Sequence, residues 1–408
     1  MTERANTPEL RFPEFRDEWE IKIIKELFNV VSGSTPLRSN TSYYENGNIP
    51  WVKTTDLNNS LINDTSEKVT DIALNNLKLL PKDTVLIAMY GGFNQIGRTG
   101  ILNIKATTNQ AISALIKKGN YNSKFLQSYL NFNVKQWRRF AASSRKDPNI
   151  TKKDIEKFKI PYTCLEEQEK IGTFFSKLDQ QIELEEKKLE LLEQQKKGYM
   201  QKIFTQKLRF KDKTGNIYPN WKTTELKDIL EKIIDNRGKT PDNAPSEKYP
   251  LLEVNALGYY HPSYKKVSKF VSENTYNNWF REHLKENDIL FSTVGNTGIV
   301  SLMDNYKAVI AQNIVGLRVN NNNIPSFVYY MLSYWENQKK IKRIQMGAVQ
   351  PSVKVSQFKF IKYLIPIKDE QEKIANLLSE IDKVINKQLI KIEVLKQRKQ
   401  GLLQKMFV

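Results

Sequence analysis

The chain has 408 residues, of which 39% are hydrophobic and 27% are charged, a composition typical of a globular protein with two or more domains. Its net charge of +19 favours a nucleic-acid partner over an anionic membrane surface, and solubility alone would be better served by acidic residues. The single cysteine, Cys164, excludes a disulfide framework and a cysteine-based zinc site, and the absence of a signal-peptide core or an 18-residue apolar run predicts a cytoplasmic protein without a membrane span.

The first 165 residues predict a domain of mixed strands and helices. "DTVLIAMY" (83–90) and "AISALIKK" (111–118) are short, rich in β-branched residues and bounded by Gly, Asn and Lys, which is typical of strands. "SKFLQSYLNFNVKQWRRFAA" (123–142) predicts helices with aromatic stripes, and we expect those stripes in the core. A short basic helix around Lys152–Lys157 then leads through "KIP" (159–161) to the next segment.

Residues 166–204 predict one long helix. The segment contains no proline, and its apolar residues recur at alternating spacings of four and three, which is the heptad period of a left-handed coiled coil. A helix of about 37 residues is roughly 55 Å long. Because only one face is apolar, this helix needs a partner.

Residues 205–368 predict a second mixed domain, with an aromatic-striped helix entered at Pro325, and residues 369–408 predict a second long helix. The pentapeptide "EQEKI" opens both long helices, at Glu167–Ile171 and Glu370–Ile374. Without gaps, 166–204 and 369–407 agree at 17 of 39 positions.

The two heptad seams match each other, so we expect the helices to pair with one another rather than each packing on its own domain. Both seams are broken by polar residues at equivalent places, Glu185 and Gln388, then Lys196 and Lys399. The predicted coiled-coil residues are Phe175, Leu178, Ile182, Leu189, Leu192, Leu378, Ile381, Ile385, Ile392 and Leu395.

The duplication extends into the mixed domains. "LRF" opens each half, at 10–12 and 208–210, and "SGSTP" (32–36) corresponds to "RGKTP" (237–241). The matches keep the same order but are confined to turns and strand edges. A shared scaffold with divergent loops indicates two readers with different targets, although sequence drift is an alternative explanation.

No catalytic constellation occurs in the sequence. Gly92–Thr99 resembles a phosphate-binding loop, but Arg98 stands where lysine is needed and the second half lacks the basic residue. The only histidines, His261 and His283, lie in the second half, which excludes a duplicated histidine site. Adenine-methyltransferase and nuclease motifs are also missing, so an enzyme is the least favoured interpretation and no metal or cofactor is expected on this chain.

What remains is recognition, because loops rich in Arg, Lys, Asn, Gln, Thr and Tyr can hydrogen-bond base edges and phosphates. The candidates in the first half are Arg38, Tyr43, Lys53, Thr54, Asn94, Gln95, Arg98, Arg145 and Lys146. Those in the second half are Arg237, Lys239, Asn255, Tyr259, Tyr260, Lys265, Asn296, Thr297, Arg343 and Gln350. Taken singly, each of these residues is better explained by ordinary surface exposure, and only the loops as a set favour recognition.

The basic charge, the two divergent mixed domains and the two similar helices together resemble the specificity (S) subunit of type I restriction-modification systems. The resemblance covers essentially the whole chain. Its most telling features are "EEQEKI" and "DEQEKI" after an Ile-Pro step, preceded by "DPNITKKDIEKFKIP" (147–161) and "QPSVKVSQFKFIKYLIP" (350–366). The chain departs from a strict repeat where "RKDPN" (145–149) faces "GAVQP" (347–351).

The resemblance implies an α+β fold with two target recognition domains, each reading half of a bipartite double-stranded DNA sequence. The long helices would pair antiparallel with pseudo-twofold symmetry; we expect Leu178 near Lys399 and Lys196 near Ile381. The partners would be two modification subunits that use S-adenosylmethionine, and restriction subunits that use ATP and Mg²⁺.

Two other functions are compatible with the pattern. A pseudo-dimeric DNA-binding regulator or architectural protein would act alone and dimerise through its helices. A scaffold that does not bind DNA would carry its charge incidentally. Co-purification with a methyltransferase subunit separates the family interpretation from both.

Overall fold

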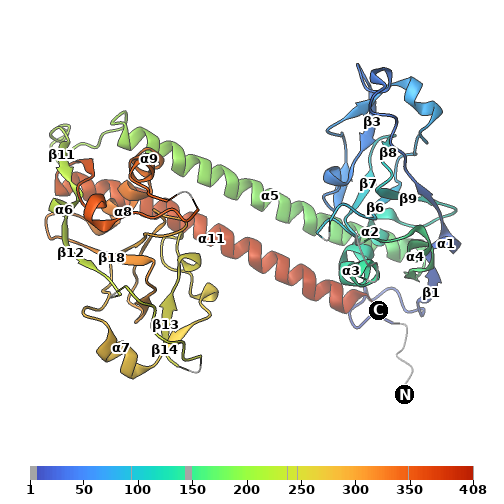
Figure 1. The fold of residues 1–408 in the computed structure, drawn as a ribbon. Coiled ribbons are helices and arrows are strands. Elements are labelled where there is room, and N and C mark those ends of the chain that lie inside the picture. The colour runs from blue at the N-terminus through green and yellow to red at the C-terminus, as the bar shows by residue number, and fades with distance from the viewer. Residues whose placement is uncertain are drawn as a thin grey trace. The chain divides into compact units, whose positions relative to one another are not determined.

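The computed structural model describes residues 7–92, 94–142, 149–236, 238–245, 247–347 and 349–407 (Figure 1). The chain divides into two compact units: unit 1 contains Met1–Lys187 and Ile390–Val408, and unit 2 contains Lys188–Leu389. The long helices are α5 (Leu165–Phe204) and α11 (Lys368–Met406). Each unit therefore combines a mixed domain with part of both helices.

Unit 1 is built on a five-stranded sheet of order β2-β9-β6-β7-β4, a three-stranded sheet β5-β3-β8 and a two-stranded sheet β1-β10. Its elements before α5 are β1 (Glu20–Ile23), α1 (Ile24–Leu27), β2 (Phe28–Ser32), η1 (Thr41–Tyr43), β3 (Ile49–Val52), η2 (Thr54–Asp56), β4 (Ser60–Ile62), β5 (Lys68–Val69), η3 (Asp71–Asn75), β6 (Val85–Ala88), β7 (Thr99–Leu102), β8 (Thr107–Thr108), β9 (Ile112–Lys117), α2 (Ser123–Phe132), α3 (Val134–Ala142), α4 (Lys152–Lys157) and β10 (Lys159–Tyr162).

Unit 2 is built on a four-stranded sheet of order β12-β18-β15-β16, a three-stranded sheet β14-β13-β17 and a two-stranded sheet β11-β19. Its elements between the long helices are β11 (Lys222–Glu225), α6 (Leu226–Ile229), β12 (Leu230–Ile234), β13 (Tyr249–Leu252), η4 (Val254–Ala256), η5 (Tyr264–Lys266), β14 (Phe270–Val271), α7 (Glu273–Trp279), β15 (Ile289–Ser292), β16 (Val300–Leu302), β17 (Val309–Ile310), β18 (Ile314–Val319), α8 (Pro325–Ser333), α9 (Trp335–Arg343), α10 (Val355–Phe358) and β19 (Lys362–Ile365).

The two units share one topology. The order β2-β9-β6-β7 in unit 1 repeats as β12-β18-β15-β16 in unit 2, and unit 1 adds β4 at the edge. In each small sheet the central strand pairs antiparallel with one neighbour and parallel with the other. The predicted strands at 83–90 and 111–118 are β6 and β9. All four residues of β6 are buried, because this strand lies in the interior of its sheet.

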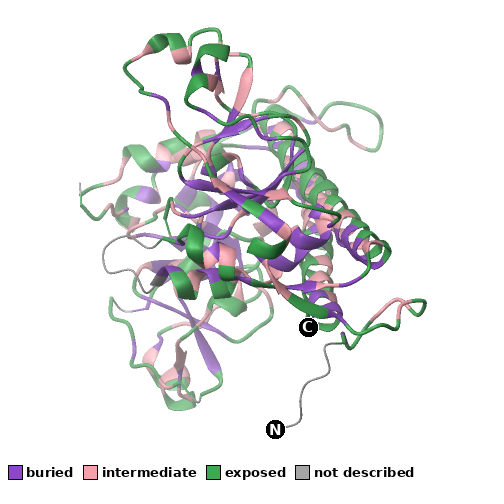
Figure 2. Ribbon diagram, turned by 90° about the vertical axis from the view of Figure 1, so that its right-hand side faces the viewer, coloured by how far each residue is buried: buried purple, intermediate pink, exposed green. Residues whose placement is uncertain are grey.

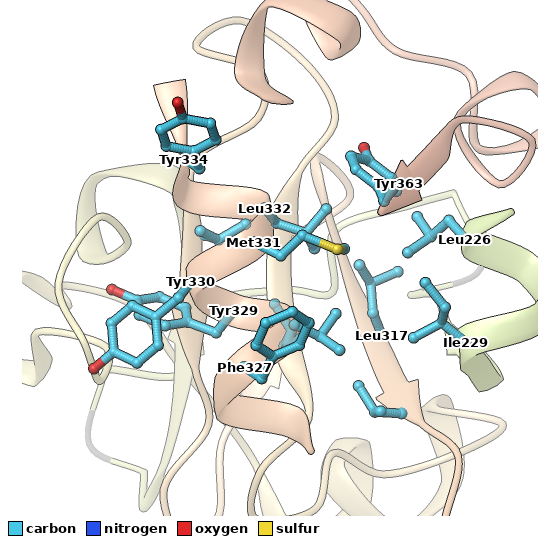
Figure 3. Close-up of a cluster of buried hydrophobic side chains, with 14 of the residues drawn as sticks. Leu226, Ile229, Leu317, Phe327, Tyr329, Tyr330, Met331, Leu332, Tyr334 and Tyr363 are labelled. Carbon is cyan, nitrogen blue, oxygen red and sulfur yellow. The ribbon is translucent and has the colours of Figure 1, made fainter. Parts of the chain in front are cut away.

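The aromatic-striped helices supply the cores, as expected. In unit 2 the residues of α8 from Phe327 to Leu332 are all buried. Figure 3 shows them beside Leu317 of β18 and Leu226 and Ile229 of α6. Pro325 occupies the first turn of α8, where its missing N–H leaves no helical hydrogen bond unmade. Figure 2 shows buried residues gathered on the strands and on one side of the helices.

The end of α11 completes the core of unit 1. Phe407 is buried, and its ring lies 5.3 Å from the rings of Phe125 and Tyr129 and 5.8 Å from that of Phe175, measured between centroids. The end of α5 does the same in unit 2, where the Phe204 ring contacts three aromatic rings. The long helices therefore belong to the cores as well as to each other.

The long helices run antiparallel. In unit 1, Lys399 forms an ion pair with Asp179, and the Lys391 ammonium lies 2.5 Å from a carboxylate oxygen of Glu185. Residue numbers thus fall on α11 as they rise on α5. In unit 2 the Lys196 ammonium lies 2.6 Å from Asp382. These partners are one residue from the expected ones, which confirms the predicted direction and register of pairing.

The ten predicted coiled-coil residues are buried or half-buried. Phe175, Ile182, Leu378 and Ile392 are buried, and the other six are half-buried. The polar breaks lie on the same seam: Gln388 is buried, and Lys196 and Lys399 pair with the aspartates of the facing helix.

Candidate DNA interface

The first glutamate of "EQEKI" anchors the N-terminal segment of unit 1 to α5. Glu167 is fully buried and accepts two hydrogen bonds from Arg11, at 2.6 and 2.7 Å. The Trp19 indole N–H donates at 3.0 Å, and the Thr163 hydroxyl at 2.5 Å. Burial alone would raise the pKa of Glu167, but these hydrogen bonds outweigh it and hold the pKa below its ordinary value.

Unit 2 repeats this arrangement. Glu370 is also fully buried, and Arg209 donates to its two oxygens at 2.8 and 3.0 Å. The Trp221 indole N–H completes the set at 3.1 Å. The arginines of the two "LRF" tripeptides are thus partners of the "EQEKI" glutamates, together with one tryptophan in each unit, and each set ties a mixed domain to its helix.

The glutamine of "EQEKI" joins the start of the long helix to the start of an aromatic helix. The Gln168 amide oxygen accepts from the backbone N–H of Asn122, which caps α2. In unit 2 the Gln371 amide oxygen accepts from the N–H of Ile324, which precedes α8. Both glutamines are buried, so the repeated pentapeptide has a structural role rather than a DNA-contacting one.

Three predicted contact residues of unit 1 gather at the small sheet. The Lys53 ammonium lies 3.0 Å from the Glu67 carboxylate, and Arg38 pairs with the same carboxylate. These cations lower the pKa of Glu67 to about 2, with Arg38 the largest cause, so its carboxylate is ionised at neutral pH. Tyr43 lies in the neighbouring turn η1, where the side-chain amide of Asn76 donates to its hydroxyl at 3.3 Å. Because Arg38 is exposed and Lys53 is half-buried, the cluster presents a mixed charge to solvent.

The glycine-rich turn of unit 1 brings together Thr54, Gln95 and Gly91. A Cβ on Gly91 would lie 2.6 Å from the Gln95 amide oxygen and 3.3 Å from the Thr54 hydroxyl, and Gly91 has a φ of +119°. Thr54 is buried, Asn94 is exposed, and Arg98 is half-buried with its side chain donating to the Asn94 carbonyl at 3.2 Å. Arg145 and Lys146 lie outside the described residues.

The candidates of unit 2 lie in several loops. Lys239, Asn255, Tyr259 and Lys265 are exposed, and the Lys266 ammonium lies 4.9 Å from the Tyr259 ring centroid. Arg237 lies outside the described residues.

Tyr260 differs from these neighbours because it packs inward. Its ring centroid lies 5.3 Å from that of Tyr329 and 6.0 Å from that of Tyr330, and burial raises the pKa of its hydroxyl. These contacts give the ring a role in the core of unit 2.

A cavity of about 840 Å³ lies in unit 2 beside α5 and contains two of the predicted residues, Asn296 and Thr297. Glu193, Lys196 and Lys197 of α5 also line it, as does Tyr334. Arg343 and Gln350 are exposed, and each lies next in the sequence to a residue that lines the cavity. The lysines and amides of the lining suit an anionic, hydrogen-bonding surface such as nucleic acid.

The sequence prediction did not select the carboxylate that pairs with Arg38 and Lys53. Glu67 was not among the residues predicted for DNA contact, nor were Asn243, Glu253 and Lys269, which occupy the equivalent positions of unit 2. The sequence does contain a signal for this equivalence. "IPWVKTTDL" (49–57) and "YPLLEVNAL" (249–257) share a proline and a leucine at matching places, which aligns position 53 with position 253.

Within the described ranges, no three His, Cys, Asp or Glu side chains come together as a metal site. Over the same residues, no helix is both long enough and apolar enough to cross a membrane.

Two segments of the chain, residues 16–194 and 218–395, match the family described as Type I restriction modification DNA specificity domain. The chain belongs to this family. Each copy spans one mixed domain and most of its long helix, so the family's unit is the repeat seen in the sequence and the fold. As a specificity subunit, the chain supplies DNA recognition to a type I restriction-modification complex and is not itself an enzyme.

Similar proteins and a similar solved structure support the assignment. The type I restriction enzyme MjaVIII specificity subunit of Methanocaldococcus jannaschii is 25% identical, over 97% of this chain and 93% of that protein. The type I restriction enzyme EcoR124I/EcoR124II specificity subunit of Escherichia coli is 26% identical over a shorter stretch, which covers 42% of this chain and 43% of that protein. The crystal structure of the S subunit from M. genitalium, at 16% identity, has a TM-score of 0.64 and covers 98% of this chain and 99% of its own. The predicted family and fold class are confirmed.

Proposed function

We propose that unit 1 and unit 2 each recognise one half of a bipartite double-stranded DNA target. The observation that carries this is the presence of two specificity domains on one scaffold with unlike polar loops. Arg38, Lys53 and Glu67 in unit 1 stand where unit 2 has Asn243, Glu253 and Lys269. Because base identity is read by such side chains, two unlike sets favour two unlike half-sites.

The partners that we propose are two modification subunits and the restriction subunits of the same system. The modification subunits would methylate adenine with S-adenosylmethionine, and the restriction subunits would use ATP and Mg²⁺. The chain itself would bind none of these cofactors. Since its target is cellular DNA, we place it in the cytoplasm. The net charge of +19 supports a polyanionic ligand.

A domain exchange tests the proposal. Residues 1–165 are replaced by the corresponding domain of another specificity subunit, the complex with its methyltransferase is prepared, and methylated adenines are mapped. We expect one half of the methylated motif to change and the other half to persist. The matched control replaces 205–368, which should change the opposite half. A change in both halves, or in neither, would contradict the assignment of one half-site to each unit.

The second candidate, a DNA-binding regulator acting alone, is not favoured because both halves match the specificity domain family. Co-purification distinguishes the two. A specificity subunit is expected to retain a methyltransferase subunit through gel filtration, whereas a regulator would bind its site as the isolated chain.

A further inference from the structure

The equivalent positions of the two small sheets carry an ion pair of opposite polarity. In unit 1, Lys53 follows β3 and pairs with Glu67, with 3.0 Å between the ammonium and the carboxylate. In unit 2, Glu253 follows β13 and pairs with Lys269 at 2.8 Å. The cation of one unit thus stands where the other unit has the anion.

The equivalence rests on backbone register and not on the ion pairs themselves. Ile49 pairs with Val69 in unit 1, and Tyr249 pairs with Val271 in unit 2. The next backbone hydrogen bond along this strand pair is also present in both units. The N–H of Trp51 donates to the carbonyl of Glu67 at 3.1 Å, and in unit 2 the N–H of Leu251 donates to Lys269 at 2.9 Å.

The short helices that follow repeat as well. Lys53 is the N-cap of η2 and Glu253 is the N-cap of η4. The Lys53 carbonyl accepts from Asp56 N–H and the Glu253 carbonyl from Ala256 N–H, both at 2.9 Å. Positions 53 and 253 therefore have the same backbone setting, and only the side chains are exchanged.

These pairs are accessible to a ligand. The side chains of Lys53 and Glu67 are 30% and 26% exposed, and those of Glu253 and Lys269 are 30% and 43% exposed. Ion pairs with this exposure contribute little to stability, so stability does not account for the inversion. Both pairs border residues predicted for DNA contact, since Thr54 follows Lys53 and Asn255 lies two residues after Glu253.

A neighbouring position carries a cation in unit 1 and a neutral residue in unit 2. Arg38 adds a second cation to Glu67, and its guanidinium lies 4.6 Å from the Tyr44 ring centroid. The equivalent residue of unit 2, two places beyond the matching proline, is Asn243. Its amide oxygen instead accepts from the backbone N–H of Phe270 at 3.0 Å. The cation-rich side of the cluster is thus limited to unit 1.

The major groove offers a ligand that matches such a pair. In a G·C base pair, guanine presents two acceptors, N7 and O6, and cytosine presents the N4 amino donor. A cation beside a carboxylate is complementary to these edges, with the cation facing guanine. An A·T pair is a poorer match, because its N6 donor lies between two separate acceptors, adenine N7 and thymine O4, so the cation meets one acceptor instead of the adjacent N7 and O6 of guanine.

We propose that Lys53–Glu67 and Glu253–Lys269 are specificity-determining pairs that each read one G·C base pair, in opposite orientations within their half-sites. The inference rests on the proposed function and deepens it, since it names the base pair and the side chains that read it. In unit 1 the residue after the central strand faces guanine, and in unit 2 it faces cytosine.

A charge exchange tests this. Because Arg38 also pairs with Glu67, the exchange Lys53→Glu/Glu67→Lys is combined with Arg38→Asn, which matches Asn243 of unit 2; the ion pair is then kept but inverted, and the methylated motif of the complex is mapped. We expect G·C to be replaced by C·G at one position, in the half-site read by unit 1 only. Glu253→Lys/Lys269→Glu should do the same in the other half-site. The control Glu20→Lys/Lys22→Glu inverts an ion pair on β1 and should leave the motif unchanged.

A neutral variant keeps the test decisive if the inverted pair proves inactive. Lys53→Ala/Glu67→Ala is compared with the parent complex in binding to oligonucleotides that carry each base at each position. We expect discrimination to fall about 10- to 100-fold at one base pair. An unchanged motif, or a loss of affinity that is uniform across all sequences, would overturn the inference. Either result would leave the domain-exchange experiment, and hence the proposed function, untouched.

Discussion

One buried glutamate at the start of each long helix holds an arginine and a tryptophan from far earlier in the chain. The Arg11–Glu167 contact joins residues 156 positions apart, and Arg209–Glu370 joins residues 161 apart. A buried carboxylate needs such partners because desolvation otherwise disfavours its charged form. The repeated "EQEKI" thus marks two anchoring points, each of which orders the opening segment of one repeat against a helix.

Replacing Glu167 by Gln leaves the guanidinium of Arg11, whose side chain is only 9% exposed, without its countercharge. We expect the free energy of unfolding of unit 1 to fall by about 3 kcal/mol, since breaking one partner of a buried pair is strongly destabilising. Denaturant unfolding of the full chain measures it. Lys170→Gln, at an exposed pair with Glu14, is the matched control and should change stability by less than about 1 kcal/mol. Equal effects would refute the anchoring role.

The same carboxylate predicts a pH dependence. Hydrogen bonds hold the pKa of Glu167 below the value of 4.5 expected for an unfolded chain. Its stabilising contribution is therefore complete above pH 4.5 and is lost as the pH falls through the lowered pKa of the folded state. Thermal unfolding between pH 7 and pH 3 should show this loss. Glu167→Gln should show a weaker dependence, and an unchanged pH profile in that variant would argue against the assignment.

At the scale of elements, the two long helices have two tasks, pairing with each other and closing the cores. The seam alternates apolar contacts with ion pairs such as Lys399–Asp179. Polar seam residues with specific partners fix direction and register, whereas apolar ones are more permissive.

Reversing the charge of Lys399 tests the register. Lys399→Asp sets two carboxylates against each other, and we expect a loss of about 1 kcal/mol that Asp179→Lys restores in the double variant. The double-mutant cycle, measured by chemical unfolding, gives the coupling energy. Lys188, an exposed lysine of α5, provides the control reversal Lys188→Asp. No coupling between positions 179 and 399 would mean that this pair does not set the register.

A substitution of Phe407 tests the second task of the long helices, which is to close the cores. Truncation to alanine removes its contacts with Phe125, Tyr129 and Phe175. A buried phenylalanine replaced by alanine costs about 3–5 kcal/mol, so we expect a clear drop in the midpoint of thermal unfolding. Leu184→Ala, at a position 66% exposed, should change stability by at most about 0.5 kcal/mol. A neutral Phe407→Ala would show that the helix end is dispensable for the core.

At the scale of the whole molecule, the net charge of +19 is the property that most affects association. Lysine and arginine that neutralise phosphates release counterions, so the binding constant falls as salt rises, with a slope of roughly −0.9 for each phosphate.

Salt titration of DNA binding by the assembled complex measures this slope. We expect log K to decrease steeply and linearly with log salt. Lys239→Gln removes an exposed cation of unit 2, and we expect it to make the slope shallower by about 0.9, the contribution of one phosphate contact. Lys383→Gln, an exposed lysine of α11, is the control and should leave the slope unchanged. A flat titration would contradict electrostatic DNA binding.

Much of this architecture could be predicted before the fold was known, because its signals are periodic or local. The heptad seams placed α5 and α11, β-branched runs placed β6 and β9, and Pro325 placed the start of α8. The charge and the two unlike loop sets indicated DNA recognition. The candidate interface was harder to predict, and Tyr260 illustrates why. An exposed-looking tyrosine between turn residues packs on Tyr329, about 70 positions later in the sequence.

The sequence by itself determined that the protein is one unit written twice, with a helix at the end of each copy, because repetition and period are visible without any contact. Only the tertiary structure decided which charges meet. Glu67 reaches Lys53 across a strand pair, and Phe407 reaches a core formed by residues more than 200 positions earlier. Such partners depend on register and packing between distant segments, which no local pattern encodes.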